Sequence, residues 1–290
     1  MSKRFAALAA AALTGWVGAG IGAGTASAGT VGHVTPDYFA GTGNANGGFT
    51  IGTGGGVEIG LRAKLRFDDT NTPQNVFNQV GTSNVYEFEP RAADPGFSFF
   101  PSDGRTPIWN FDWSINTDFD EDDGLGGDLA EFTYVLSLGD GKGGALTFDP
   151  INDARIPDDP LTPGVDESVV QWDHALGGNG SGPDCNAAGA CVSFSNADLD
   201  EAGYLNEIDS TNVAQNSWNY RFFVDAIDPA FDPTAPGSYD ISLTAFKDGS
   251  QVASSSIQVN VVPAPLGLLL LPTAFVAAAA LRRRRRAASV

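Results

Sequence analysis

The feature that most limits how this chain folds is an unbroken two-residue alternation of apolar and polar side chains. In the stretch VEIGLRAKLRF, every second residue from Val57 to Phe67 is apolar, and the residues between them are charged or glycine. The stretch WNFDWSIN, residues 109–116, repeats the pattern. Because successive side chains of a strand point to opposite faces of a sheet, both stretches predict strands with one buried face and one face in water.

Turn signals separate such stretches. Asp248-Gly249 lies between two alternating runs and fits a two-residue hairpin turn, since this dipeptide accepts positive φ angles. The glycine-rich GDGKGG, residues 139–144, follows the alternating EFTYVLSL and predicts a second reversal. The body shows no sustained helical periodicity. The sequence therefore predicts an all-β fold, an antiparallel β-sandwich of the jelly-roll or immunoglobulin-like kind.

The predicted sandwich body occupies residues 29–260. Within it, residues 155–191 form a seam in which the apolar pattern thins out. The seam is either a long loop or a boundary between two sandwiches. We expect one elaborated domain, because the strands on either side are few enough to share a core.

The first 28 residues predict a secretory signal peptide. Two basic residues precede an Ala/Leu-rich apolar stretch, which ends in Ala26-Ser27-Ala28, the small-x-small pattern after which signal peptidase cuts. We expect residues 1–28 to be removed and the exported protein to begin at Gly29. The alternative, a membrane-anchoring first helix, is disfavoured by the glycines of this stretch, which weaken a helix.

Between the two ends the chain is strongly acidic. All 35 Asp and Glu lie within residues 29–265, whereas seven of the 16 Lys and Arg lie outside that range. A body of this charge repels nucleic-acid phosphates and anionic lipids, so both are disfavoured as its partners. The acidity favours solubility and cations instead.

An uncharged apolar run near the C-terminus predicts a transmembrane helix. Residues 261–281 contain no charge, and a helix of about 20 such residues crosses a bilayer. By the positive-inside rule, the arginine-rich tail, residues 282–290, stays in the cytoplasm and the acidic body lies across the membrane. The alternative is a buried core helix with a basic tail for nucleic acid. The arginines are Arg282, Arg283, Arg284, Arg285 and Arg286.

The tail resembles a known class of sorting signals. A proline motif comes first, then the apolar run, then the arginines, and this order is similar to that of the PEP-CTERM class and its VPxP-type relatives. Ala264 stands where the name-giving motif has Glu. The motif residues are Val262, Pro263, Ala264 and Pro265.

The resemblance implies partners and a location. Exosortases, membrane-embedded cysteine peptidases of Gram-negative bacteria, read such tails and cut near the proline motif. The chain is then anchored transiently in the inner membrane before it passes to the cell envelope, the outer surface or the extracellular matrix. The implied partners are the membrane, signal peptidase, the sorting peptidase and exopolysaccharide.

The two cysteines, Cys185 and Cys191, bracket the short segment NAAGA. In an oxidising compartment we expect them to form a disulfide bond, since so short a loop can bring their Cα atoms close together. A metal or redox pair is the alternative. A zinc site is disfavoured, because there is no second cysteine pair and the two histidines, His33 and His174, are far apart in sequence.

An acidic stretch, TDFDEDDGLGGDL, follows the predicted strand at 109–116. Its carboxylates are the hard oxygen ligands that Ca²⁺ takes. The spacing excludes an EF-hand, because Asp123 stands where glycine is required and Leu129 stands where glutamate is required. The alternatives are an irregular calcium loop and a solvated turn. The candidate ligands are Asp118, Asp120, Asp122, Asp123 and Asp128.

The sequence carries none of the common catalytic motifs. It lacks Gly-x-Ser-x-Gly, His-Glu-x-x-His and Gly-x-x-x-x-Gly-Lys-Ser/Thr. Asp173 and His174 are neighbours beside Trp172, and we expect His174 to be an exposed loop residue. The protein is therefore predicted to be a structural or adhesive protein without catalysis of its own.

A second function class stays open. The same scaffold serves secreted carbohydrate-binding and carbohydrate-active modules, in which tryptophans stack on sugar rings. Alternation assigns Trp109 and Trp113 to the core face of a strand, which disfavours them as platforms. A concave face with exposed tryptophans and a carboxylate pair would favour this class, and a closed sandwich would favour the structural one. The candidate platforms are Trp109, Trp113, Trp172 and Trp218.

Overall fold

The computed structural model describes residues 29–41, 44–68, 75–96, 104–120, 124–152, 174–181, 192–194 and 201–263. Within these residues the strands form two sheets. The seven-stranded sheet has the spatial order β1 (Thr30–Gly32), β2 (Phe49–Gly54), β3 (Val57–Leu65), β5 (Trp109–Asn116), β10 (Val213–Asn219), β8 (His174–Gly177) and β9 (Val192–Phe194). The five-stranded sheet has the order β4 (Val85–Phe88), β12 (Ser250–Val261), β11 (Gly237–Lys247), β6 (Thr133–Gly139) and β7 (Ala145–Phe148).

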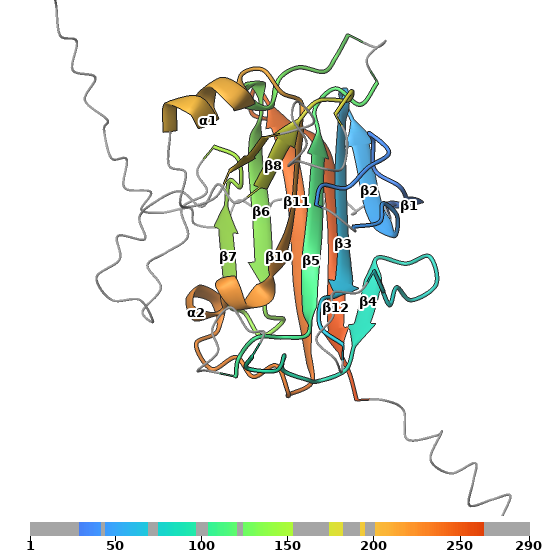
Figure 1. Ribbon diagram of the computed structural model, residues 1–290, viewed down its shortest axis with the longest axis vertical. Coiled ribbons are helices and arrows are strands. Elements are labelled where there is room, and N and C mark those ends of the chain that lie inside the picture. The colour runs from blue at the N-terminus through green and yellow to red at the C-terminus, as the bar shows by residue number, and fades with distance from the viewer. Residues whose placement is uncertain are drawn as a thin grey trace, which may run out of the picture.

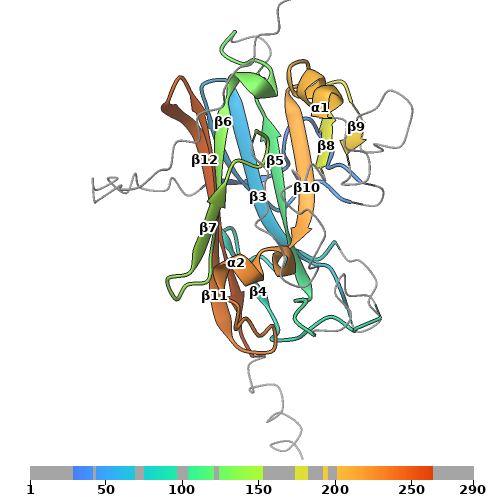
Figure 2. The same cartoon turned by 90° about the vertical axis from the view of Figure 1, so that its left-hand side faces the viewer.

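The two sheets pack face to face, and the predicted all-β sandwich is confirmed. Figure 2 shows β12, β6 and β7 in one layer and β3, β5 and β10 in the other. Neighbouring strands are antiparallel, except that β4 runs parallel to β12. In the described part of the chain the helices are short and lie at the ends of the sandwich (Figure 1): α1 (Glu201–Ile208), α2 (Val224–Ile227), and the 3₁₀ turns η1 (Leu129–Glu131) and η2 (Tyr220–Phe222).

The core lies between the sheets and is built by the alternating apolar residues. Trp109 and Trp113 of β5 are both buried there, as the alternation predicts. The ring of Trp109 lies 5.3 Å from Tyr220 and 5.5 Å from Tyr239 of β11, so aromatic contacts join the two layers. Trp113 lies 5.1 Å from the ring of Trp218 on β10.

The turn predictions are also confirmed. Asp248 and Gly249 have φ angles of 52° and 74° and join β11 to β12. Residues 140–144 join β6 to β7, which pair antiparallel. The strand β8, inside the predicted seam at 155–191, pairs with β10 of the same seven-stranded sheet.

The prediction of one face in water is wrong for the two central strands. Every residue of β5 is buried, and of β3 only Leu65 is partly exposed. The polar residues of these strands face away from the core, but residues 33–41 and 44–48, here called the N-terminal segment, lie over them, as the blue trace in front of β3 and β5 shows (Figure 1). The sequence did not reveal this cover, because an irregular segment has no apolar periodicity.

The C-terminal end of the described chain differs by one residue from the predicted boundary. Val261, predicted to open the apolar run, is the last residue of β12 and is buried. The backbone N–H of Val262 donates to the carbonyl of Phe88 in β4 at 2.9 Å. Residues 264–290 lie outside the described residues, and no helix among the described residues is long and apolar enough to cross a membrane.

Candidate functional site

The outer face of the seven-stranded sheet carries a layer of buried polar side chains. The strand register places Arg62 of β3 opposite Asp112 of β5, and Asp112 opposite Ser217 of β10. Side chains from all three central strands contribute, so the layer follows from the order of the strands rather than from any one motif. Its members are Glu58, Arg62, Lys64, Asn110, Asp112, Ser114, Asn116, Gln215 and Asn219.

These side chains hold the N-terminal segment through its backbone. Gln215 Oε1 accepts from the N–H of Ala40 at 2.8 Å. Arg62 Nη1 donates to the carbonyls of Ala45 and Gly47 at 2.8 and 2.6 Å. Because buried polar groups need partners, these bonds hold the segment on the sheet, although Arg62 Nη2 and Asp112 Oδ1 have no hydrogen-bond partner among the described residues.

A four-residue cluster forms the centre of this layer. Asp112 Oδ2 accepts from Arg62 Nε at 2.7 Å and lies 3.2 Å from Lys64 Nζ. The same Lys64 Nζ donates to Asn44 Oδ1 of the N-terminal segment at 2.9 Å. Asn44 Nδ2 in turn donates to the carbonyl of Ala40 at 2.7 Å, which fixes the orientation of the amide.

Aromatic rings shield Arg62 and Lys64 of this cluster from water, whereas Asn44 is partly exposed. The guanidinium carbon of Arg62 lies 4.8, 4.2 and 4.4 Å from the ring centroids of Phe39, Phe49 and Phe77. Lys64 Nζ lies 5.6 Å from the Phe39 ring. The side chains of Arg62 and Asp112 have no exposed surface, and that of Lys64 is 5% exposed. Cation–π contacts of this kind gain strength when water is absent.

Burial and charge shift the two titrating groups of the cluster. Burial lowers the pKa of Lys64, although the adjacent Asp112 carboxylate opposes that shift. Burial alone would raise the pKa of Asp112, but the charges of Lys64 and Arg62 outweigh it and hold that pKa below its ordinary value. Asp112 is therefore ionised at neutral pH, and Lys64 loses its proton more easily than an exposed lysine.

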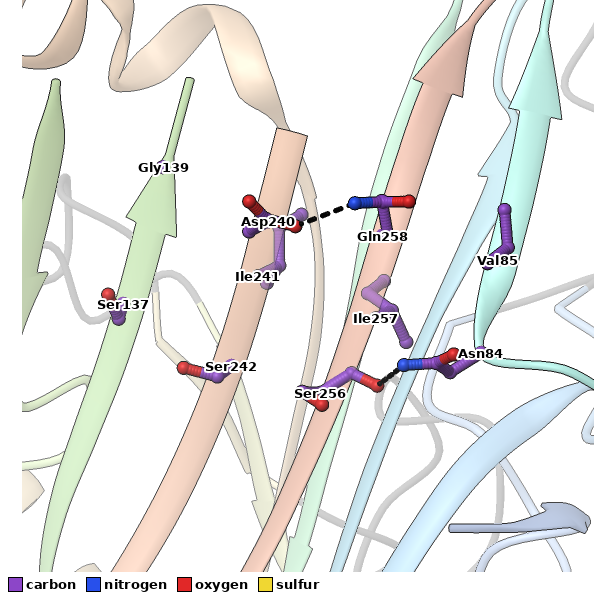
Figure 3. A pocket seen from close by; sticks show the side chains of 10 residues that line it. All are labelled: Asn84, Val85, Ser137, Gly139, Asp240, Ile241, Ser242, Ser256, Ile257 and Gln258. Carbon is purple, nitrogen blue, oxygen red and sulfur yellow. Dashed lines mark hydrogen bonds between the residues drawn. The ribbon is translucent and has the colours of Figure 1, made fainter. Parts of the chain in front are cut away.

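The outer face of the five-stranded sheet carries a shallow groove, here called the serine groove. Ser137, Ser242 and Ser256 face each other across β6, β11 and β12 in one row, as the register requires. Figure 3 shows the neighbouring row, where Gln258 Nε2 donates to Asp240 Oδ1 at 3.1 Å. The groove encloses about 360 Å³, and its lining consists of Asn84, Val85, Ser137, Gly139, Asp240, Ile241, Ser242, Ser256, Ile257 and Gln258.

The predicted calcium loop is described only in part. Asp118, Asp120 and Asp128 are described, whereas Asp122 and Asp123 are not. Partial burial and the nearby carboxylates of Glu131, Asp209 and Asp118 raise the pKa of Asp128, so acidic groups do gather here. No group of three or more His, Cys, Asp or Glu in the described residues has an arrangement that could hold a metal ion.

His174 is not the exposed loop residue that the sequence predicts. It lies in β8 with 2% of its surface exposed, and its Nε2 is 3.0 Å from the hydroxyl of Tyr204 on α1. Its ring packs 5.5 Å from Trp113. Burial lowers the pKa of His174 to about 3, which keeps the imidazole neutral at physiological pH.

The predicted sugar platforms do not form an exposed face. Trp109, Trp113 and Trp218 are all buried in the core, so none of these three can stack on a sugar. Trp172 lies outside the described residues.

The remaining predicted sites fall mostly outside the described residues. Gly29, Val262 and Pro263 are described, and an added side chain at Gly29 would collide with the carbonyl of Ile51. The following lie outside: Ala26, Ala28, Cys185, Cys191, Ala264, Pro265, Arg282, Arg283, Arg284, Arg285 and Arg286.

The cluster of Arg62, Lys64, Asp112 and Asn44 was not predicted. Its one sequence signal is that Arg62 and Lys64 occupy the same face of one strand and Asp112 the non-core face of the next described central strand. Opposite charges on neighbouring strands favour pairing across a sheet. Asn44 carries no such signal.

Fold and site together define a two-sheet β-sandwich whose N-terminal segment closes over a buried ionic cluster. Comparisons with protein-family models, with curated proteins and with solved structures gave no match.

Proposed function

We propose that the protein is an exported, non-catalytic β-sandwich with a structural or adhesive role at the envelope or in the extracellular matrix of a Gram-negative bacterium. One observation carries the proposal: β12 ends at Val261, and the proline motif begins at the next residue. The last strand of the sandwich therefore leads directly into the tail that resembles a sorting signal. A peptidase that reads the tail would release or transfer an intact fold.

The sandwich suits exposure outside the cell. The hairpin of β11 and β12 spans the length of its sheet, and the polar cluster of the other sheet is sealed by the N-terminal segment. Chain ends that are tied into a fold resist fraying and proteolysis. On this proposal the leader at 1–28 and the tail from Val262 onward serve delivery, and the body is the delivered part.

A test compares the full chain with a variant of its proline motif in the native host. Pro263→Ala combined with Pro265→Ala should leave membrane-bound precursor, while the matched control Pro229→Ala, in the loop between α2 and β11, should be processed normally. Deletion of the protein should alter surface texture, aggregation or matrix retention. Mature surface material that routinely contains peptides reaching Arg282 would show a plain anchor and contradict the sorting part of the proposal.

The serine groove favours a second candidate, binding of neutral polysaccharide. Among its ten lining residues Asp240 alone is charged, and the serines, Asn84 and Gln258 supply hydroxyl and amide groups that donate and accept hydrogen bonds. Such groups match the hydroxyls of a sugar chain, and an open groove across several strands admits a polymer rather than a small molecule. This candidate keeps the body non-catalytic.

A bulky substitution in the serine groove tests whether the groove binds polysaccharide. Ser242→Trp fills the middle of the serine row without touching the core, so co-sedimentation with purified matrix polysaccharide should be lost. Ser250→Trp, on the same hairpin but at its exposed tip, is the matched control and should bind as the unaltered protein does. Equal binding by both variants would remove the groove from the proposal and leave the structural role.

A further inference from the structure

The cluster on the outer face of the seven-stranded sheet brings together an amine and a carboxylate that are buried and an amide that is partly exposed. Lys64 Nζ lies 2.9 Å from Asn44 Oδ1 and 3.2 Å from Asp112 Oδ2. The amide carbon to which Asn44 Oδ1 is bonded is therefore within reach of the lysine nitrogen. Reactive groups held this close and screened from water react far faster than the same groups in solution.

We propose that Lys64 and Asn44 become joined by an intramolecular amide bond between Lys64 Nζ and Asn44 Cγ. The bond links β3 covalently to the N-terminal segment. It is an autocatalytic modification, since the three groups it needs come from this chain. It is independent of the proposed function.

The reaction balances without a co-reactant. The Asp112 carboxylate accepts a proton from the Lys64 ammonium group, and the neutral amine attacks Asn44 Cγ. The bond from Cγ to Nδ2 then breaks. One hydrogen of the attacking amine and the proton held by Asp112 pass to the departing nitrogen, which leaves as ammonium, and Asp112 is again a carboxylate. An ammonium group and a primary amide have become a secondary amide and an ammonium ion.

The surroundings favour attack by Lys64, although the charges that hold the pKa of Asp112 below its ordinary value oppose the transfer of a proton to it. Burial lowers the pKa of Lys64, which increases the fraction present as the nucleophilic amine. Arg62 holds Asp112 Oδ2 at 2.7 Å and keeps the proton acceptor beside Lys64. The Phe39 ring lies 5.6 Å from Lys64 Nζ and the Lys64 side chain is 5% exposed, so little water solvates the amine. The Asn44 amide is oriented by its bond to the Ala40 carbonyl at 2.7 Å.

A simple ion pair and hydrogen bond would show the same contacts, so the test must detect the covalent bond. The full chain is unfolded after purification and digested with trypsin. Without the bond, trypsin cuts after Arg62, Lys64 and Arg66 and releases Ala63-Lys64 as a free dipeptide. With the bond, residues 63–66 stay attached to the peptide that ends at Arg62, at a mass lower by one ammonia than the sum of the two peptides.

Variants then identify the partners. Lys64→Arg keeps a positive charge but offers no such amine, and Asn44→Ala removes the acceptor, so both should abolish the joined peptide. Asn46→Ala is the matched control, because Asn46 lies in the same segment but donates to Val34 and Asp37. It should retain the joined peptide. Folded Asp112→Asn should form the bond slowly or not at all, and formation at full rate would overturn the role of Asp112.

The peptides recovered from the unaltered protein decide the proposal, because this result does not depend on whether the variants fold. The joined peptide should account for most of the Asn44 peptide in folded protein. Complete recovery of free Ala63-Lys64 from folded protein would overturn the proposal. So would a joined peptide that persists in Asn44→Ala, since the acceptor would then be another residue.

Discussion

Arg62 and Asp112 form an ion pair in which neither side chain has exposed surface, with Arg62 Nε 2.7 Å from Asp112 Oδ2. The pair lies outside the core, between the seven-stranded sheet and the N-terminal segment. Arg62 also donates to the carbonyls of Ala45 and Gly47. The buried pair thus connects the seven-stranded sheet to the N-terminal segment, although the strand pattern of the sequence does not indicate that the two lie together.

Removal of one partner of this pair should be costly. Asp112→Ala leaves Arg62 buried without its counter-charge, and breaking a buried pair in this way costs about 3–5 kcal/mol of unfolding free energy. Urea denaturation measures the loss. The exposed pair between Lys142 and Asp228, 3.2 Å apart, is the control, and Lys142→Ala should cost about 0–1 kcal/mol. Equal losses in the two variants would contradict the stabilising role of the buried pair.

Replacement of both partners should be milder. The double variant Arg62→Met with Asp112→Leu removes both charges of the pair and leaves Lys64 as the one charge of the cluster. Well-packed apolar replacements of buried pairs are often neutral. The Ala45 and Gly47 carbonyls still lose their donor, so we expect the double variant to be more stable than Asp112→Ala but less stable than the unaltered protein. The same urea series tests this order. A double variant as unstable as the single one would show that losing the hydrogen bonds to the segment costs as much as leaving Arg62 without its counter-charge.

His174 should make stability depend on pH. Its pKa in the folded protein is about 3, below its ordinary value of 6.5, because it is buried. Above pH 6.5 the residue is neutral in both states and contributes no pH dependence. Below pH 6.5 the unfolded state binds a proton and the folded state does not, so stability falls by about 1.4 kcal/mol per pH unit until the pH reaches the folded pKa.

The contribution of His174 is isolated by difference, because many carboxylates titrate over the same range. The unfolding free energy of His174→Gln should fall less steeply between pH 6.5 and 4 than that of the unaltered protein. His33→Gln alters an exposed histidine that pairs with Asp37 and is the control. Parallel curves for the unaltered protein and His174→Gln would contradict the buried, neutral state of His174.

Melting temperatures test the hypothesis that the acidic loop binds calcium. Burial and neighbouring carboxylates raise the pKa of Asp128, so the ionised form is disfavoured in the folded state. Asp128→Asn should therefore raise the melting temperature in EDTA. If the loop binds calcium, the ion should raise the melting temperature of the unaltered protein more than that of the variant, since a ligand that binds only the folded state stabilises it. If the unaltered protein melts at the same temperature in calcium and in EDTA, the loop does not bind calcium and is a solvated turn.

Strand alternation predicted which side chains form the core, because that pattern depends on the backbone alone. Trp109, Trp113 and Leu61 face inward as expected. Alternation could not predict whether the other face of the central strands is exposed or buried. Whether Arg62 and Lys64 face water or protein depends on where the irregular N-terminal segment lies, and that is decided by contacts between distant residues, such as that of Asn44 with Lys64.

The same reason explains the error at His174. In the sequence it stands inside the seam at 155–191, where apolar residues thin out, which is typical of an exposed loop. In the structure β8 pairs with β10, and α1 brings Tyr204 to the imidazole. A strand of four residues is too short to show a period, and its burial comes from elements distant in the sequence, namely β5, β10 and α1.

The last prediction concerns the site at which the tail is cut, if it is processed as proposed. Val261 is buried and paired with Phe88, and the N–H of Val262 donates to the Phe88 carbonyl, so the backbone up to Val262 is engaged in the sheet. A peptidase needs an extended, unpaired backbone, and β12 could supply it before Val262 only by leaving the sandwich. We therefore expect the C-terminus of mature surface material, read by mass spectrometry, to lie at Val262 or beyond. Phe88→Pro keeps the carbonyl of residue 88 but strains the edge strand that holds Val262, so it should shift part of the cleavage toward Val261, whereas Val85→Ala, at the other end of β4, should not. A mature C-terminus at or before Asn260 in the unaltered protein would show that the sandwich opens during processing.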